Sequence, residues 1–280
     1  MICISCHEAV TGSFTNFLDY AILFQKEYNA EIMTSISYFN SMLQKTYREY
    51  DLKHKLLSKQ KSIKFLSSDV IFTDFVSLIK LLSGFWILQC DRLILFDNLE
   101  VYLFLNQIYS NPLLSRFSIL TKLKSLRRFF EMLIKVKNVF FLVTPSISDK
   151  VAEQLQFVDK VRVIPYYKKI NIPVFKTIKY SSNGKCFSRE YVSQDIHMLR
   201  SNENPFDYDC YIYRRRQILS FYEMFGRMIF EFILLGKEVK ILDPHVQDGL
   251  TLYLQKFGTS KNSIEQICYT INQDVRELLS

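Results

Sequence analysis

Glycine is scarce in this chain, with only 7 among 280 residues. Loops that wrap a phosphate in backbone amides usually contain several glycines, so any phosphate-binding loop here must work with few of them. Charged residues interrupt the longest apolar runs well short of about 18 residues, and the sequence therefore predicts no membrane-spanning helix. The N-terminus lacks both a basic segment and a long apolar segment, which argues against a secretory signal.

The 6 cysteines are scattered along the chain rather than clustered. This distribution favours free thiols in a reducing compartment, so we expect a cytoplasmic protein. Cys3, Cys6 and His7 spell C-x-x-C-H, which is also the pattern of a haem attachment site. Such attachment requires export, and no leader precedes Cys3. We therefore interpret this segment as a buried first strand in which cysteine acts as a small hydrophobic residue.

Positive charge is present in excess and is unevenly distributed. The net charge is +8, and the first 198 residues hold 26 basic against 17 acidic side chains. The excess gathers in residues 48–64, 122–137 and 168–189. A lysine-rich solvated surface is the simplest interpretation, but a polyanion or an anionic membrane surface is also a candidate partner.

Short apolar runs alternate with helical patterns, which predicts an α/β fold with a parallel sheet and helices on both faces. The expected strands of the first half are residues 2–6, 30–36, 69–75, 91–98, 138–145 and 160–165. A helix is expected over 14–28. The basic stretch 166–190 is expected to be an irregular crossover, which separates an N-terminal domain (1–165) from a smaller C-terminal domain (166–280). The second domain is expected to contain strands 209–216 and 237–242, and helices 223–236, 249–258 and 263–279.

The expected helix 223–236 carries two glutamates in apolar surroundings. Glu231 lies among Met228, Phe230 and Phe232, where a carboxylate is costly unless something pairs with it. Glu223 lies two turns earlier on nearly the same face. The helix follows a strand, so its N-terminus points to the edge where α/β domains bind ligands. A carboxylate at position 231 could accept two hydrogen bonds from a ribose diol.

This stretch resembles the E-x7-E segment of GT-B-fold glycosyltransferases, chiefly the retaining ones. The matching residues are Ser220, Glu223, Phe225, Gly226, Glu231, Gly236 and Val239. The resemblance implies two Rossmann-like domains facing a central cleft, with a trimmed second domain. It also implies that Glu223 lies by the donor sugar, that Glu231 binds the nucleotide ribose, and that Gly226, Arg227 and Met228 meet the diphosphate. The implied donor is a nucleotide-sugar, most simply a UDP-sugar, and no tightly bound cofactor is expected.

The same family usually supplies a basic pair against the diphosphate. Lys185 with Arg189 is one candidate pair, and the run from Arg214 to Arg216 is the other. Arg214 and Arg216 would share one face of a strand, while Arg215 points away. A solvated strand edge is an equally good interpretation of three consecutive arginines.

On the acceptor side, His7 and Gly12 follow the first expected strand, where the family joins acceptor and donor sugar. His7 could be a base or a positioning group, or an ordinary loop histidine. Asp97 and Asp74 end expected strands at the same edge, and either could act as a base in an inverting reaction. No D-x-D-like metal motif stands out, and the remaining histidines lack ligand spacing, so no metal site is expected.

The acceptor is a hydroxyl group, for which the charge suggests two sources. The first is DNA: the resemblance includes phage enzymes that glycosylate hydroxymethylated bases, which would place this protein in the host cytoplasm. Lysines and arginines would hold phosphates, with Tyr47, Tyr50, Phe129 and Phe130 nearby. The second is a lipid-linked or cell-surface glycan, reached through the basic amphipathic segment 113–137 at an anionic membrane surface. That segment could equally pack its apolar face on the sheet. A GT-B scaffold that only binds a partner remains the alternative to an enzyme.

Overall fold

The structure is a computed structural model. It describes residues 1–6, 12–35, 54–57, 64–84, 86–97, 119–143, 145–156, 158–165, 183–189, 191–200, 203–214, 227–242, 258, 260, 262 and 277–279. The chain divides into two compact units, Met1–Tyr167 and Lys168–Leu278, with Leu279 grouped with the first and Ser280 with the second. Each unit is described separately below.

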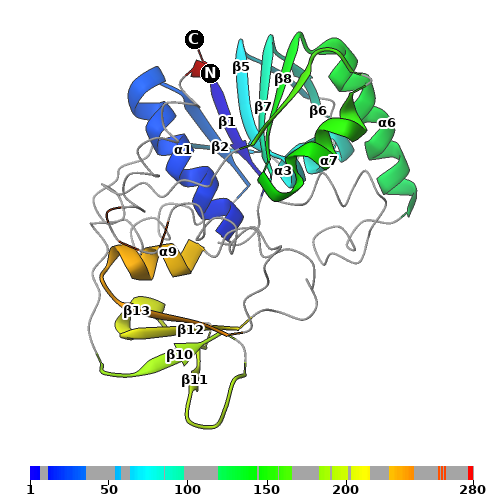
Figure 1. Cartoon of the computed structure of the whole chain (residues 1–280). Helices are drawn as coiled ribbons and strands as arrows, with labels where there is room; N and C mark the ends of the chain where they lie inside the picture. Colours follow the sequence, from blue (N-terminus) through cyan, green and yellow to red (C-terminus); the bar gives the residue numbers. More distant parts are fainter. Residues whose placement is uncertain are drawn as a thin grey trace. The chain divides into compact units, whose positions relative to one another are not determined.

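A seven-stranded parallel sheet forms the centre of the first unit (Figure 1). Its strand order is β3-β2-β1-β5-β7-β8-β9. The strands are β1 (Ile2–Ser5), β2 (Glu31–Thr34), β3 (His54–Leu56), β5 (Val70–Asp74), β7 (Arg92–Asp97), β8 (Asn138–Val143) and β9 (Val161–Pro165). The chain moves outward from β1 to β3, then returns beside β1 and moves outward the other way. This is the doubly wound order, with its switch point between β1 and β5.

Helices cover both faces of this sheet, as the sequence predicts. They are α1 (Gly12–Tyr28), α3 (Phe75–Ser83), α6 (Ile119–Lys135) and α7 (Pro145–Leu155). On one face, Phe72 contacts three rings of α1, which are Phe17, Tyr20 and Phe24. On the other face, Phe129 of α6 contacts Phe75 and Phe141. Phe72 and Phe141 pair with Ile94 and Leu95, which are consecutive residues of β7, so their rings point to opposite faces.

The second unit contains a four-stranded parallel sheet in the order β11-β10-β12-β13. Its elements are β10 (Cys186–Ser188), β11 (His197–Met198), the 3-10 helix η1 (Pro205–Asp207), β12 (Cys210–Arg214), α9 (Arg227–Leu234) and β13 (Glu238–Leu242). The chain steps from β10 to β11 in one direction and from β12 to β13 in the other. The switch point of this sheet therefore lies between β10 and β12.

Several elements differ from the sequence-based expectation. The predicted irregular stretch 166–190 contains β10, so that part of the prediction is wrong. Four further strands were not predicted, namely β3, β11, β4 (Lys64–Ser67) and β6 (Trp86–Gln89). The expected helices 249–258 and 263–279 lie almost entirely outside the described residues. None of the helices in the described part of the chain is long and apolar enough to cross a membrane.

Candidate functional site

Helix α9 occupies the position in the second unit where a ligand-binding helix is expected. It follows β12, the strand beside the switch point, and packs on β12 and β13. Met228, Ile229, Phe230, Phe232 and Leu234 of this helix are all buried. The sequence drives this burial because nearly every position of the helix is apolar.

Glu231 is the buried carboxylate of α9, with 7% of its surface exposed. It also interacts with another group of the chain. Glu231 therefore has a partner within the protein, and its burial does not by itself require a ribose diol. A ligand would have to use an acceptor position that this internal interaction leaves open, since a carboxylate offers about four lone-pair sites.

Gly236 ends α9 in a defined geometry. Its φ is +71°, in the left-handed region, and its amide donates to the carbonyl of Ile233 at 3.0 Å. The amide of Lys237 donates to the carbonyl of Phe232 at 2.9 Å. These two bonds form a Schellman motif, which places glycine at the residue after the helix cap. Gly236, one of the two glycines that match the E-x7-E segment, thus ends the helix here.

A buried aromatic cluster holds α9 on the sheet. Phe232 lies with its ring centroid 5.6 Å from Phe187, 5.8 Å from Tyr211 and 5.9 Å from Phe206. The ammonium group of Lys237 lies 5.9 Å from the same ring. The helix is therefore fixed by side chains from β10, β12 and η1, and its position does not depend on a ligand.

The candidate diphosphate cations lie at different ends of the sheet. Lys185 precedes β10, and its carbonyl accepts from the amide of Asp209 at the amino edge. Arg189 and Arg214 lie at the carboxyl ends of β10 and β12, and both are exposed. The guanidinium of Arg214 donates to the carbonyl of Tyr191 at 2.9 Å. Among the candidates that the structure describes, Arg189 and Arg214 are thus at the edge where the switch point opens.

Several predicted site residues fall outside the described part of the chain. These are His7, Glu223, Gly226 and Arg216, together with the side chains of Asp97 and Arg227. Of the remaining two, Met228 is buried in α9 and Gly12 is the first residue of α1. The structure therefore gives no geometry for the pair Glu223 and Glu231.

At the switch point of the first unit, four residues form a polar network. Asp74 caps α3: its Oδ1 accepts from the Ser77 amide at 2.8 Å, and its Oδ2 accepts from the Ser77 hydroxyl at 2.5 Å. The Ser77 hydroxyl oxygen accepts from the Cys6 amide at 2.7 Å. Lys80 Nζ donates to the Cys6 carbonyl at 3.0 Å. Asp74 therefore has a structural role that accounts for its burial, and the network fixes the carboxyl end of β1 against α3.

Replacing Ser77 with alanine should lower the free energy of unfolding of the first unit by about 1–3 kcal/mol, because the buried Cys6 amide would lose its acceptor. Urea denaturation followed by Trp86 fluorescence measures this, since Trp86 is the single tryptophan and lies in the first unit. Ser83→Ala is the control, because the Ser83 hydroxyl makes one local bond to the Lys80 carbonyl. Equal effects of the two substitutions would contradict the role given to Ser77.

A second titratable cluster lies beside β11, and sequence analysis missed it. His197 Nε2 lies 2.8 Å from Glu203 Oε2, which also accepts from the Arg200 amide at 2.8 Å. The His197 ring stacks on Tyr208 at 5.3 Å. The Arg200 amide, and after it His197, lower the pKa of Glu203, while burial raises the pKa of Tyr208. The cluster closes the loop after β11, and a turn of this kind leaves no periodic signal in the sequence.

The thiols of the described cysteines are free, as expected, and burial raises the pKa of three of them, Cys3, Cys90 and Cys210. Burial raises the pKa of Cys210 to about 12, and burial followed by the charge of Asp91 raises that of Cys90 to about 12. Neither thiol is a nucleophile at neutral pH. Among the described residues, no group of three or more His, Cys, Asp or Glu could hold a metal ion.

The basic helix α6 packs its apolar face on α3 and on the main sheet of the first unit. Phe129, Met132, Leu133 and Val136 are buried, so packing on the sheet is the correct interpretation of these last turns. Phe129 is fully buried, so its ring is not available at the surface to stack on a base. Tyr47 and Tyr50 lie outside the described residues.

No protein-family model matches this chain, and no curated protein matches its sequence.

Proposed function

We propose that this protein is a glycosyltransferase that moves a sugar from a nucleotide-sugar, most simply a UDP-sugar, to a hydroxyl acceptor. The observation that carries the proposal is the place of Glu231. It is a buried carboxylate on the helix that follows the switch-point strand of a parallel sheet. That place agrees with the E-x7-E resemblance, in which the second glutamate binds the nucleotide ribose. We infer a GT-B arrangement on the same grounds.

In the proposed site, Glu231 accepts hydrogen bonds from the ribose hydroxyls. The backbone amides of Gly226, Arg227 and Met228 meet the diphosphate, where the N-terminus of a helix favours negative charge. Arg189 and Arg214 are at the carboxyl edge of the sheet and add positive charge there. Lys185, at the opposite edge, is left out of this role. Glu223 orients the donor sugar.

The reaction breaks the bond between the anomeric carbon and the diphosphate oxygen and forms a bond from that carbon to the acceptor oxygen. The acceptor proton goes to the leaving diphosphate in a retaining reaction or to a protein base in an inverting one. His7 and Asp97 are the proposed groups on the acceptor side. Asp74 is a weaker base candidate, because both of its oxygens already accept hydrogen bonds.

For the acceptor we propose a hydroxymethylated base in duplex DNA, with the positive first unit holding phosphates. The support is the charge of residues 1–167, which hold 20 basic against 15 acidic side chains, an excess of five. A glycan or lipid-linked acceptor on an anionic surface is the alternative.

Transfer itself tests the proposal. Purified protein is mixed with a panel of nucleotide-sugars and duplex DNA that contains either cytosine or hydroxymethylcytosine, and the digested nucleosides are weighed by mass spectrometry. A hexose or pentose mass on hydroxymethylcytosine alone is the expected result. Nucleotide-sugar binding without a new mass would keep the donor assignment and exclude this acceptor. If no nucleotide-sugar binds, the enzyme assignment is wrong and a binding scaffold remains.

A further inference from the structure

A two-stranded ribbon extends the first unit at the amino edge of its main sheet. Strands β4 and β6 pair in parallel, from Lys64 with Trp86 to Ser67 with Gln89. Two residues follow each of these strands, and the same register then continues into β5 and β7, where Val70 pairs with Arg92. In the described part of the chain, β4 and β6 form a sheet of two strands, so each presents an outer edge without a partner strand.

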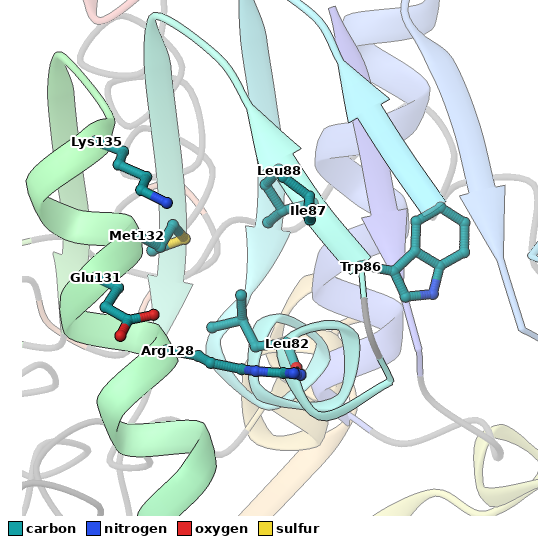
Figure 2. Close-up of a pocket in the computed structure, with 8 residues that line it drawn as sticks. All are labelled: Leu82, Trp86, Ile87, Leu88, Arg128, Glu131, Met132 and Lys135. Carbon is teal, nitrogen blue, oxygen red and sulfur yellow. The ribbon is translucent and has the colours of Figure 1, made fainter. Parts of the chain in front are cut away.

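A pocket of about 250 Å³ lies between this ribbon and α6 (Figure 2). It is lined by Leu82, Trp86, Ile87, Leu88, Arg128, Glu131, Met132 and Lys135. Three consecutive residues of β6 contribute, although successive side chains of a strand point to opposite faces. The pocket therefore borders the edge of β6 rather than one of its faces. The pocket lies at the amino-terminal ends of the strands of the main sheet, opposite to the carboxyl ends that carry Asp74 and the switch point.

The apolar surface continues beyond the pocket along the ribbon. Phe65 is 72% exposed and Ile87 is 44% exposed. They are register partners on neighbouring strands, so they lie side by side on one face. An exposed strand edge with large apolar side chains invites pairing with another chain. A ligand small enough for the pocket would leave Phe65 uncovered, which favours a larger partner.

The charges at the mouth of the pocket favour an acidic partner. Lys135, Met132 and Arg128 extend from α6 toward β6 (Figure 2). Arg128 also donates to the Leu82 carbonyl, which holds its guanidinium at the mouth. Glu131 also lines the pocket, and it pairs with the exposed Arg127 at 2.8 Å. The mouth thus has a net positive charge over an apolar floor.

We propose that this edge is a docking site for an acidic, hydrophobic segment of a partner protein. The segment adds as an extended strand to the outer edge of β6 and places one apolar side chain in the pocket. Its acidic residues lie against Lys135 and Arg128. A membrane is less suited, because a flat headgroup layer takes protruding side chains rather than filling a concave pocket. A nucleic acid is less suited, because it has no peptide backbone to pair with the edge of β6 and no apolar side chain to fill the pocket.

Trp86 makes the proposal directly testable, because it is the single tryptophan of the chain and lines the pocket. The probes are a panel of capped nine-residue peptides that alternate aspartate or glutamate with leucine or phenylalanine. We expect a saturable shift of the Trp86 emission with a Kd below about 1 mM. Methylation of the backbone nitrogens on one side of the peptide should abolish binding, since an added strand depends on those donors. Matched peptides with lysine in place of the acidic residues should not bind.

Charge reversal at the mouth gives the matched variants. Lys135→Glu should weaken peptide binding about tenfold or more, whereas Lys150→Glu, the same change on α7 away from the pocket, should leave it unchanged. Ile87→Asp, at an exposed position, should also weaken binding and should not impair folding. The proposal is wrong if no acidic peptide shifts the emission, or if Lys135→Glu behaves like Lys150→Glu. It is equally wrong if phosphatidylserine vesicles or single-stranded DNA shift the emission and the peptides do not.

Discussion

Replacing Glu231 with alanine should weaken binding of a UDP-sugar about 30- to 150-fold, as measured by isothermal titration calorimetry. The carboxylate accepts charge-assisted hydrogen bonds from the ribose in the proposed site, and such bonds contribute about 1.5–3 kcal/mol each. Loss of about 2–3 kcal/mol corresponds to that change in Kd. The Glu231→Gln variant keeps the size of the side chain but removes its charge. Its affinity for the UDP-sugar should lie between those of the unchanged protein and of Glu231→Ala.

The control for this prediction is Glu238→Ala. Glu238 lies on the neighbouring β13, is exposed, and pairs with Lys240 at 3.3 Å. Its removal takes away the same charge from the same unit without touching α9, so UDP-sugar affinity should not change. Because Glu231 is buried and has a partner in the chain, circular dichroism must first show that each variant is folded. Unchanged affinity in a folded Glu231→Ala protein would rule out the ribose assignment.

The central strands could be predicted because burial on both faces leaves a continuous apolar run. β8 is the clearest case: after Asn138, every one of its residues is buried, and its bounds agree with the predicted 138–145 to within two residues. The short strands at the edges lack this signal. In β4, Phe65 is exposed and Leu66 is buried, and in β6, Ile87 is exposed and Leu88 is buried. Such short segments carry no clear signal, and only their pairing with each other defines them as strands. β10 has three residues in a basic stretch, so nothing in its composition distinguishes it from a loop.

The candidate site was only partly predictable, because its residues have structural roles that motif spacing does not show. Gly236 matches the family pattern, yet its φ of +71° and its Schellman bonds are sufficient reason for a glycine there. Lys185 and Arg189 are close in sequence, but a strand between them places them at opposite edges of the sheet. Asp74 follows a strand as a base might, and the structure shows that it caps the next helix. The roles of Gly236 and Asp74 depend on local backbone geometry, and the separation of Lys185 from Arg189 depends on a three-residue strand; the motif spacing specifies neither.

The second large effect is expected at Lys237, which has 7% of its side chain exposed. Its ammonium group donates to the carbonyls of Phe206 and Tyr208, each at 2.7 Å, and lies 3.7 Å from Asp209. These contacts tie η1 and the start of β12 to the end of α9. Lys237→Met keeps the aliphatic chain but leaves both carbonyls without this donor. It should lower the stability of the second unit by about 2–4 kcal/mol, because hydrogen bonds to a charged group contribute about 1.5–3 kcal/mol each.

Hydrogen exchange followed by mass spectrometry tests this prediction unit by unit, since the single tryptophan reports on the first unit alone. In Lys237→Met, amides of β12 and β13 should exchange more than about tenfold faster, while those of β5 and β7 keep their rates. Lys240→Met is the matched control, because Lys240 is exposed and pairs only with the exposed Glu238 among the ion pairs of the described residues. Its effect should stay within about 0.5 kcal/mol. If both variants exchange alike, the bonds from Lys237 do not hold η1 and β12 to α9, and the fixed position of α9 must then come from the aromatic cluster around Phe232 alone.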